Sequence, residues 1–189
     1  MSINLQKGQQ VNLSKEDGGD LSKVIVGLGW DIARRGSAVD CDASAILCDK
    51  NGKSAGIADT IYFSNRTHPS QSIYHTGDNL TGEGADDDEQ IIVDLQRLPF
   101  RYDKIVFVVN IYKGDERKQH FAMIQNAFIR IVDSDTGKEL LRYNLSEDCP
   151  GMTGMVFGEI VRNNGKWKFS AIGKPVKASY IMDLVKLYS

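Results

Sequence analysis

Several features that mark membrane, secreted or nucleic-acid-binding proteins are missing from this chain of 189 residues. No apolar run approaches the roughly 18 residues of a membrane-spanning helix, and the first residues do not resemble a signal peptide. The chain has no basic stripe and its pI is near 5.9, which argues against nucleic acid as a partner. These absences predict a cytoplasmic protein.

Cysteine is also scarce, and the chain has neither an internal repeat nor a linker rich in proline, glycine or serine. Cys41, Cys48 and Cys149 form no Cys-x-x-Cys pair, and their odd number is typical of buried, reduced thiols rather than of a disulfide framework. A reactive thiol is the alternative. The length suffices for one sizeable core, so we expect a single domain over residues 1–189.

What the sequence does contain is a succession of short, strand-like segments. Residues 39–48 alternate in polarity, and residues 104–112 are apolar on both faces, as in a central strand. Turn residues that hairpins require lie at 49–52, 133–137 and 163–165. Helical spacing occurs at 115–124 and 178–188, and residues 7–20 are predicted to form a loop. The other predicted strands cover residues 24–28, 61–63, 90–95, 127–133, 139–145, 155–162 and 167–172. We therefore predict an all-β (mainly β) fold, a two-sheet β-sandwich with one or two short helices, including a C-terminal helix.

One segment concentrates negative charge. Residues 75–89 hold six carboxylates and three glycines, and no lysine or arginine occurs between Thr67 and Gln96. Crowded carboxylates repel one another unless a cation offsets them, and Ca²⁺ accepts about six to eight oxygen ligands. A solvated acidic turn is the alternative. The segment does not match an EF-hand, because Leu80 and Glu83 stand where that motif places an oxygen ligand and a glycine.

A second acidic pair precedes this loop. Asp40 and Asp42 are two residues apart on a predicted strand, so both side chains point to one face, with Ser44 beyond them and Cys41 facing the core. Like charges side by side on a strand are unfavourable without a cation or a basic partner. Asp31 lies just upstream as a third candidate. If the acidic loop folds back over this strand, one oxygen-lined pocket results.

Taken together, these segments resemble the TerD family, the tellurium-resistance and general stress proteins. The resemblance covers nearly the whole chain, and its most specific motif is Gly-Asp-Asn-x-Thr-Gly-x-Gly at residues 77–84. Further matching motifs are Gly-Trp-Asp at 29–31, Val-Asp-Cys-Asp-Ala-Ser-Ala at 39–45, Asp-Asp-Glu at 87–89, Asn-Ala-Phe-Ile-Arg at 126–130, Glu-Leu-Leu-Arg-Tyr-Asn-Leu at 139–145, Phe-Gly-Glu-Ile-Val-Arg at 157–162 and Trp-Lys-Phe at 167–169.

The resemblance implies a calcium-binding β-sandwich with a role in the bacterial stress response and no catalytic activity. It also implies partners among other tellurium-resistance and stress proteins, including a membrane-protein complex at the inner face of the membrane, and hence a cytoplasmic or peripheral location. Carried over residue by residue, it implies Ca²⁺ ligation by the side chains of Asp31, Asp40, Asp42, Asp78, Asn79, Asp87, Asp88 and Glu89, with the backbone carbonyls of Leu80 or Gly82.

The chain departs from the family pattern at two places. The family usually reads Gly-Asp-Gly-Asp-Asp-Glu where residues 84–89 read Gly-Ala-Asp-Asp-Asp-Glu. Ala85 removes a carboxylate, which weakens the metal site unless Asp86 replaces it as a ligand. Asn144 also stands where the family usually has Asp, and we expect it at the surface.

Three other functions compete with calcium binding. A metal-dependent hydrolase using His75 needs a base beside a bound water, but His68, His75 and His120 are scattered in the sequence, so we expect no enzyme. Direct handling of tellurite needs an accessible thiol, whereas Cys41 is expected to face the core. A small ligand such as a cyclic nucleotide would be repelled by the anionic loop unless a metal bridged the two.

Overall fold

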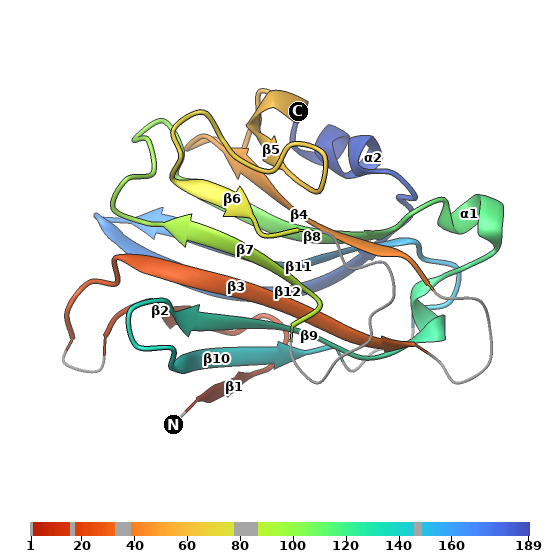
Figure 1. Ribbon diagram of the computed structural model, residues 1–189, viewed down its shortest axis with the longest axis horizontal. Coiled ribbons are helices and arrows are strands. Elements are labelled where there is room, and N and C mark those ends of the chain that lie inside the picture. Colours follow the sequence, from red (N-terminus) through yellow and green to blue (C-terminus); the bar gives the residue numbers. More distant parts are fainter. Residues whose placement is uncertain (1, 16–17, 33–38, 78–86, 146–148) are drawn as a thin grey trace.

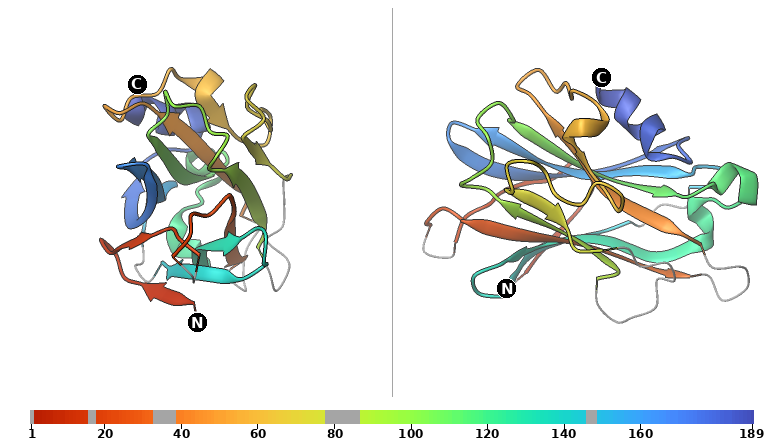
Figure 2. Two further views of the ribbon diagram at one scale, coloured as in Figure 1. Left: turned by 90° about the vertical axis from the view of Figure 1, so that its left-hand side faces the viewer. Right: turned by 45° about the horizontal axis from the view of Figure 1, so that its top comes forward.

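Strands dominate the computed structural model of the protein, which describes residues 2–15, 18–32, 39–77, 87–145 and 149–189 (Figure 1). They form two six-stranded sheets. Sheet A has the order β1 (Ile3–Leu5), β10 (Glu139–Asn144), β9 (Ile124–Asp133), β3 (Lys23–Ile32), β7 (Glu89–Asp94) and β6 (Ile73–His75). Sheet B has the order β2 (Gln10–Asn12), β12 (Lys166–Val176), β11 (Gly154–Asn163), β8 (Lys104–Ile111), β4 (Cys41–Cys48) and β5 (Thr60–Ile61). Figure 2 shows the sheets stacked face to face, which confirms the predicted β-sandwich.

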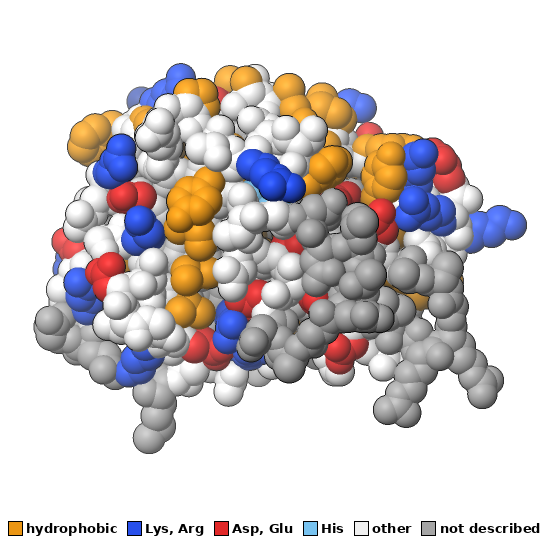
Figure 3. Space-filling model, viewed as in Figure 1, with side chains coloured by type: hydrophobic (Ala, Val, Ile, Leu, Met, Phe, Trp, Pro, Cys, Tyr) orange, Lys and Arg blue, Asp and Glu red, His pale blue; other side chains and the backbone are white. Residues whose placement is uncertain are grey.

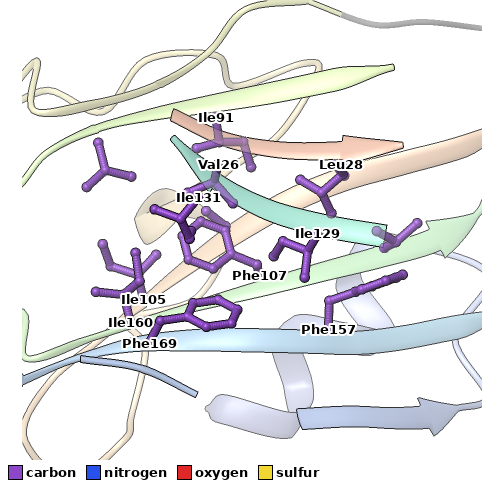
Figure 4. Close-up of a cluster of buried hydrophobic side chains, with 14 of the residues drawn as sticks. Val26, Leu28, Ile91, Ile105, Phe107, Ile129, Ile131, Phe157, Ile160 and Phe169 are labelled. Carbon is purple, nitrogen blue, oxygen red and sulfur yellow. The ribbon is translucent and has the colours of Figure 1, made fainter. Parts of the chain in front are cut away.

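The core lies between the two sheets. Alternation along each strand places one row of apolar side chains inside, as on β4, where Cys41, Ala43, Ala45 and Leu47 join the core cluster. β8 lies in the interior of sheet B and is buried on both faces, as its continuous apolar sequence predicts. Figure 4 shows the facing layers, with Val26, Leu28, Ile91, Ile129 and Ile131 from sheet A and Ile105, Phe107, Phe157, Ile160 and Phe169 from sheet B.

The predicted turns join antiparallel neighbours. Asn164 and Gly165, between β11 and β12, both have positive φ angles, of 50° and 78°. Two successive residues with positive φ give the twist that a tight hairpin requires. The predicted loop over residues 7–20 is wrong in part, because Gln10–Asn12 pairs with Lys168–Ser170 and so forms the edge of sheet B.

The C-terminal helix is confirmed. α2 (Ile181–Val185) continues into the 3₁₀ turn η3 (Lys186–Tyr188) and packs on the outer face of sheet B, where Leu184 and Val185 join Ile46, Val106 and Val156. Another 3₁₀ turn, η1 (Ile57–Asp59), precedes β5.

The helix expected over residues 115–124 is much shorter than predicted. α1 (Gly114–Arg117) ends at Lys118, which has a φ of 56° and closes the helix in the left-handed conformation. The 3₁₀ turn η2 (Phe121–Met123) then places Phe121 in the core, and β9 begins at Ile124. The demands of the core and of strand pairing here override the local helical pattern.

Among the described residues, no helix combines the length and the apolar character that a bilayer span requires.

Candidate functional site

The three acids that lead into β7 point in three different directions. Asp87 lies on the outer face of sheet A, where both of its carboxylate oxygens accept hydrogen bonds from Arg130. Asp88 folds back on β3, donating its backbone N–H to the Leu28 carbonyl and accepting the Trp30 N–H at its Oδ2, 2.8 Å away. Glu89 points into the sandwich. Consecutive positions in the sequence therefore serve three separate environments.

Glu89 links the two sheets. Its side chain is buried, and its Oε2 accepts the backbone N–H of Ala43 on β4 at 2.6 Å. The same oxygen lies 3.2 Å from Nε2 of His75 on β6, whose other ring nitrogen accepts the N–H of Gly77. A buried carboxylate with such partners keeps the start of β7 tied to the start of β4.

Asp31 and Asp88 lie near one another at the irregularity in β3 between Gly29 and Asp31. Burial raises the pKa of Asp88, and the negative charges of Asp31 and Asp87 raise it further, while the hydrogen bond from Trp30 opposes the shift. Asp31 itself is exposed and accepts a hydrogen bond from Asn126 at 2.6 Å. A cation close to Asp88 would offset the cost of burying its charge and the repulsion from Asp31 and Asp87.

Asp40 lies directly before β4 and Asp42 is the second residue of that strand, with its side chain on the face opposite to the core, as predicted. The carboxylate of Asp42 is buried and accepts a hydrogen bond from Asn110 of β8, its register partner, at 3.3 Å. Asp40 lies 3.4 Å from the guanidinium of Arg117 on α1. Beside Asp42, the Ser44 hydroxyl and the Asn110 side-chain carbonyl are buried and have no hydrogen-bond partner among the described residues.

Acids from the two stretches act on the same buried thiol, that of Cys41. Burial raises the pKa of Cys41 well above its usual value, and the negative charges of Asp42, Glu89, Asp40 and Asp88 raise it further. The acids therefore lie around the same end of β4. Within the described part of the chain, however, no group of three His, Cys, Asp or Glu residues is arranged to hold a metal ion.

Five of the predicted ligands lie outside the described residues. They are Asp78, Asn79, Leu80, Gly82 and Asp86, and the departure at Ala85 lies in the same segment. The described ligands number six, namely Asp31, Asp40, Asp42, Asp87, Asp88 and Glu89.

The sequence analysis missed the partners of these acids. Arg130, Asn110 and Asn126 each hold one of them, and only the strand alternation at residues 126–130 hinted that Arg130 would face away from the core. All three cysteines lie among the described residues and are buried thiols, as expected.

A serine–histidine–acid chain that the sequence did not reveal lies beside β6. Ser70 Oγ is 2.7 Å from Nδ1 of His68, whose Nε2 is 3.0 Å from the Tyr102 hydroxyl, and Tyr102 donates to Asp59 at 2.6 Å. Burial lowers the pKa of His68, although the charge of Asp59 opposes the shift. Ser70 also shares a hydrogen bond with Ser72. This chain ties the segment before β6 to the segment before β8.

A cleft of about 520 Å³ opens at the other end of the sandwich, beside the β11–β12 turn. The Arg162 guanidinium lies in its wall, 4.6 Å from the ring centroid of Trp167 and 5.1 Å from that of Phe100. This cleft is therefore remote from the acids predicted to bind metal.

Comparison with known proteins settles the family. A family model described as the TerD domain matches residues 1–188. This chain belongs to the TerD family. Stress response protein SCP2 of Bacillus subtilis is 44% identical over the full length of both chains. General stress protein 16U of B. subtilis is 47% identical over 92% of this chain and 90% of its own. Tellurium resistance protein TerD of Serratia marcescens is 46% identical over 92% of this chain and 91% of its own.

The TerD fold is also seen in a solved structure. The crystal structure of a homologue of the telluride resistance protein TerD from Streptomyces coelicolor superimposes with a TM-score of 0.71 at 21% identity, over 89% of this chain and 98% of that one. Asn144, which stands where TerD proteins usually have Asp, is exposed at the end of β10, as expected.

Proposed function

We propose that this TerD-family protein is a calcium-binding module of the bacterial stress response, which docks onto partner proteins and catalyses no reaction itself. The observation that carries the proposal is the contact between the two acidic stretches: the Glu89 carboxylate accepts the backbone N–H of Ala43 at 2.6 Å, directly after Asp42 on β4. Holding buried carboxylates close together costs desolvation and mutual repulsion, and the charge of a hard dication offsets both costs.

Calcium binding would join the described acids to the acidic segment of residues 78–86, which precedes Asp87 in the sequence. The oxygen donors of Asp31, Asp40, Asp42 and Asp88 suit Ca²⁺, which binds carboxylate and amide oxygens in flexible geometry. Binding would remove the repulsion and order the acids, so the protein would present a different surface with and without the ion. That difference is what a metal-dependent docking module requires.

Calorimetric titration with calcium, together with thermal melting in calcium or in chelator, tests this proposal. Calcium at about a hundredfold excess over its dissociation constant stabilises the fold by about 2.7 kcal/mol. Asp42→Asn is expected to weaken binding, whereas Asp135→Asn, at the β9–β10 turn, leaves the calcium response unchanged. An unchanged melting midpoint with no heat of binding would rule the proposal out.

Docking is supported by the surface. Large hydrophobic side chains such as Phe63, Tyr74 and Tyr180 are exposed. Figure 3 shows hydrophobic groups interspersed with charged ones rather than merged into one apolar face. Mixed surfaces of this kind suit reversible contacts, and we propose that the partners are other tellurium-resistance or stress proteins, including a complex at the inner face of the membrane.

Hydrolysis at His75 finds little support in the geometry. Both ring nitrogens of His75 have protein partners, Glu89 and the N–H of Gly77, and the side chain is buried. A general base must reach the proton of a bound water. Turnover of generic ester or phosphoester substrates that is lost in His75→Ala would favour the hydrolase instead.

Direct chemistry at the thiols is also disfavoured. Burial raises the pKa values of Cys41 and Cys48, the latter to about 11, so both stay protonated near neutral pH. The thiolate is the reactive form of cysteine. A Cys→Ser variant at all three positions is therefore expected to tolerate tellurite as well as the parent does.

A further inference from the structure

The cleft beside the β11–β12 turn has walls that backbone hydrogen bonds hold together. Leu13, directly after β2, donates its N–H to the Trp167 carbonyl of β12 at 2.8 Å. Arg162 of β11 donates its N–H to the carbonyl of Asp103, directly before β8, at 2.7 Å. The volume of about 520 Å³ lies within the range of about 300–1,000 Å³ that is typical of small-molecule sites. The walls are therefore set before a ligand arrives, which lowers the cost of binding one.

The Arg162 guanidinium in this wall leaves most of its hydrogen-bonding capacity unused. Its Nη2 donates to the Leu98 carbonyl at 3.3 Å, and this is its one hydrogen bond within the described part of the chain. Its Nε is buried and has no hydrogen-bond partner there either. A guanidinium carries five N–H donors in a planar fork that matches a carboxylate. The unused donors of Arg162 therefore suit a carboxylate that enters the cleft.

Asp103 places a negative charge beside this positive one. Its Oδ1 lies 3.9 Å from Nε of Arg162, which is close enough for an ion pair and too long for a hydrogen bond. An α-amino acid carries the same two charges on neighbouring atoms, a carboxylate beside an ammonium. With its carboxylate against Arg162 and its ammonium against Asp103, each charge of the protein pair would face its opposite, in charge-assisted hydrogen bonds.

The remaining charges of the cleft also favour a zwitterion. Asp20 and Lys166 line it, and their side chains make no hydrogen bond or ion pair with other described residues. With Asp103 and Arg162, the lining holds two acids and two bases, so its net charge is zero. A ligand that carries both charges fits such a lining better than an ion of one sign, because complementary charges select the partner.

An apolar surface lies in the same cleft. Phe100 is 90% exposed, so its ring has surface available for a ligand. Trp167 contributes a second ring, although it is only 8% exposed. Three buried leucines complete the apolar part of the lining, namely Leu13, Leu21 and Leu95. A large apolar side chain would leave water by packing against these groups.

We propose that this cleft binds a free α-amino acid with a large apolar side chain. Arg162 holds the carboxylate, Asp103 holds the ammonium, and Phe100 and Trp167 contact the side chain. The site goes beyond the proposed calcium function and does not depend on it, since none of these residues belongs to the predicted metal ligands.

Calorimetric titration with L-phenylalanine tests the proposal, in chelator so that calcium plays no part. The expected dissociation constant is about 1 mM or tighter, in keeping with a ligand of this size. Two further probes each lack one charge: 3-phenylpropionate has no ammonium, and phenethylamine has no carboxylate. Each is expected to bind at least about tenfold more weakly, because one member of the Arg162–Asp103 pair then faces no partner.

Three outcomes with these probes would overturn the proposal. The first is no heat of binding with L-phenylalanine at about 20 mM, well above the expected dissociation constant. The second is equal binding of 3-phenylpropionate, which would make the cleft a site for organic anions. The third is tighter binding of glycyl-L-phenylalanine, whose two charges are separated by a peptide bond, since this would make the cleft a site for peptides.

Variants of the charged pair test the role of each residue. Arg162→Met keeps an apolar stem and removes the donors, so L-phenylalanine is expected to bind at least about tenfold more weakly. Asp103→Asn is expected to weaken L-phenylalanine but not 3-phenylpropionate, which has no ammonium to lose. Unchanged affinity for L-phenylalanine in either variant would contradict the assignment.

A matched control and a second variant guard against loss of the fold. Arg142→Met removes a guanidinium that also lies over a ring, 4.1 Å from the Phe128 centroid, but on β10 of sheet A. Its affinity for L-phenylalanine is expected to stay within about twofold of the parent. If Arg162→Met does not fold, Phe100→Ala replaces it, because this side chain is almost fully exposed. Phe100→Ala is expected to weaken binding by about threefold or more through the lost ring contact, and unchanged affinity would overturn the proposal.

Discussion

Part of the outer face of sheet B is covered by the C-terminal helix, whereas the outer face of sheet A carries a row of ion pairs. On sheet B, Leu184 and Val185 of α2 and the side chains of Ile46, Val106 and Val156 form a second apolar cluster, separate from the main core. On sheet A, ion pairs run from Asp87, directly before β7, to Arg130 on β9 and on to Glu139 and Arg142 on β10.

The two outer faces place different requirements on the sequence. Apolar contacts tolerate substitutions that conserve volume and do not depend on charge screening, whereas a buried charge is stable only while its partner is present. Asp87 illustrates the second case, since it is fully buried and depends on Arg130. An acidic residue that is conspicuous in the sequence can therefore serve the fold rather than a ligand.

The largest loss of stability is expected when an apolar contact between α2 and sheet B is removed. Leu184 has no exposed surface, and Leu184→Ala is expected to lower the free energy of unfolding by about 2–5 kcal/mol through lost burial and the cavity left behind. Denaturant unfolding measures this. Leu187→Ala is the matched control: Leu187 is 51% exposed, and such surface changes usually stay within about 0.5 kcal/mol. Equal losses in both variants would mean that α2 is not docked as described.

High pH is expected to weaken the packing of the C-terminal segment on sheet B. Burial raises the pKa of Tyr188 to about 12 and that of Cys48 to about 11. In the unfolded chain these groups ionise near their usual values of about 10 and about 8.5, so the unfolded state loses protons first as the pH rises. Their stabilising contribution is complete below the unfolded values and is lost as the pH rises towards the folded ones.

Tyr188→Phe isolates this alkaline effect. Unfolding free energies measured by denaturant between about pH 9 and about pH 12 should fall less steeply for the variant than for the parent, because one of the two titrating groups is gone. The effect should be smaller than that of Leu184→Ala, since Tyr188 is only partly buried. Identical slopes would show that the Tyr188 hydroxyl is not shielded by the helix.

Much of this fold was predictable because its signals are local. The alternation at residues 39–48 assigned Cys41 to the core, and the spacing of Ile181, Leu184 and Val185 located the helix that covers sheet B. The helix expected near Asp115 failed for the opposite reason. The end of this helix depends on the left-handed conformation of Lys118 and on the packing of Phe121 in the core. That core is set by contacts between the two sheets, which are distant in sequence.

The candidate site was less predictable because its pairings are distant in sequence. Asp87 and Arg130 are 43 residues apart, and Glu89 and Ala43 are 46 apart. The sequence identified a cluster of acids but gave no means of telling which of them the fold neutralises. Only register could do so, by placing Gly27 between Gln90 and Arg130.

The smallest effect is expected at the exposed end of the ion-pair row. The side chain of Arg142 is 27% exposed. Arg142→Met is therefore expected to lower the free energy of unfolding by less than about 1 kcal/mol at low salt, and by less still in about 1 M salt, which screens such pairs.

The same ion pair should also respond to pH. Burial tends to raise the pKa of Glu139, but hydrogen bonds from Arg142 and Ser2 outweigh this effect and hold that pKa below its usual value. This contribution is present above the unfolded pKa of glutamate, about 4.3, and is lost as the pH falls through the folded value. The difference between parent and Arg142→Met in denaturant unfolding should therefore shrink with acid and with salt, while the loss in Leu184→Ala changes little with salt. A difference that persists under both conditions would assign the stabilisation by Arg142 to its contact with the Phe128 ring, and the contrast between the two faces would then not be one of charge against apolar cover.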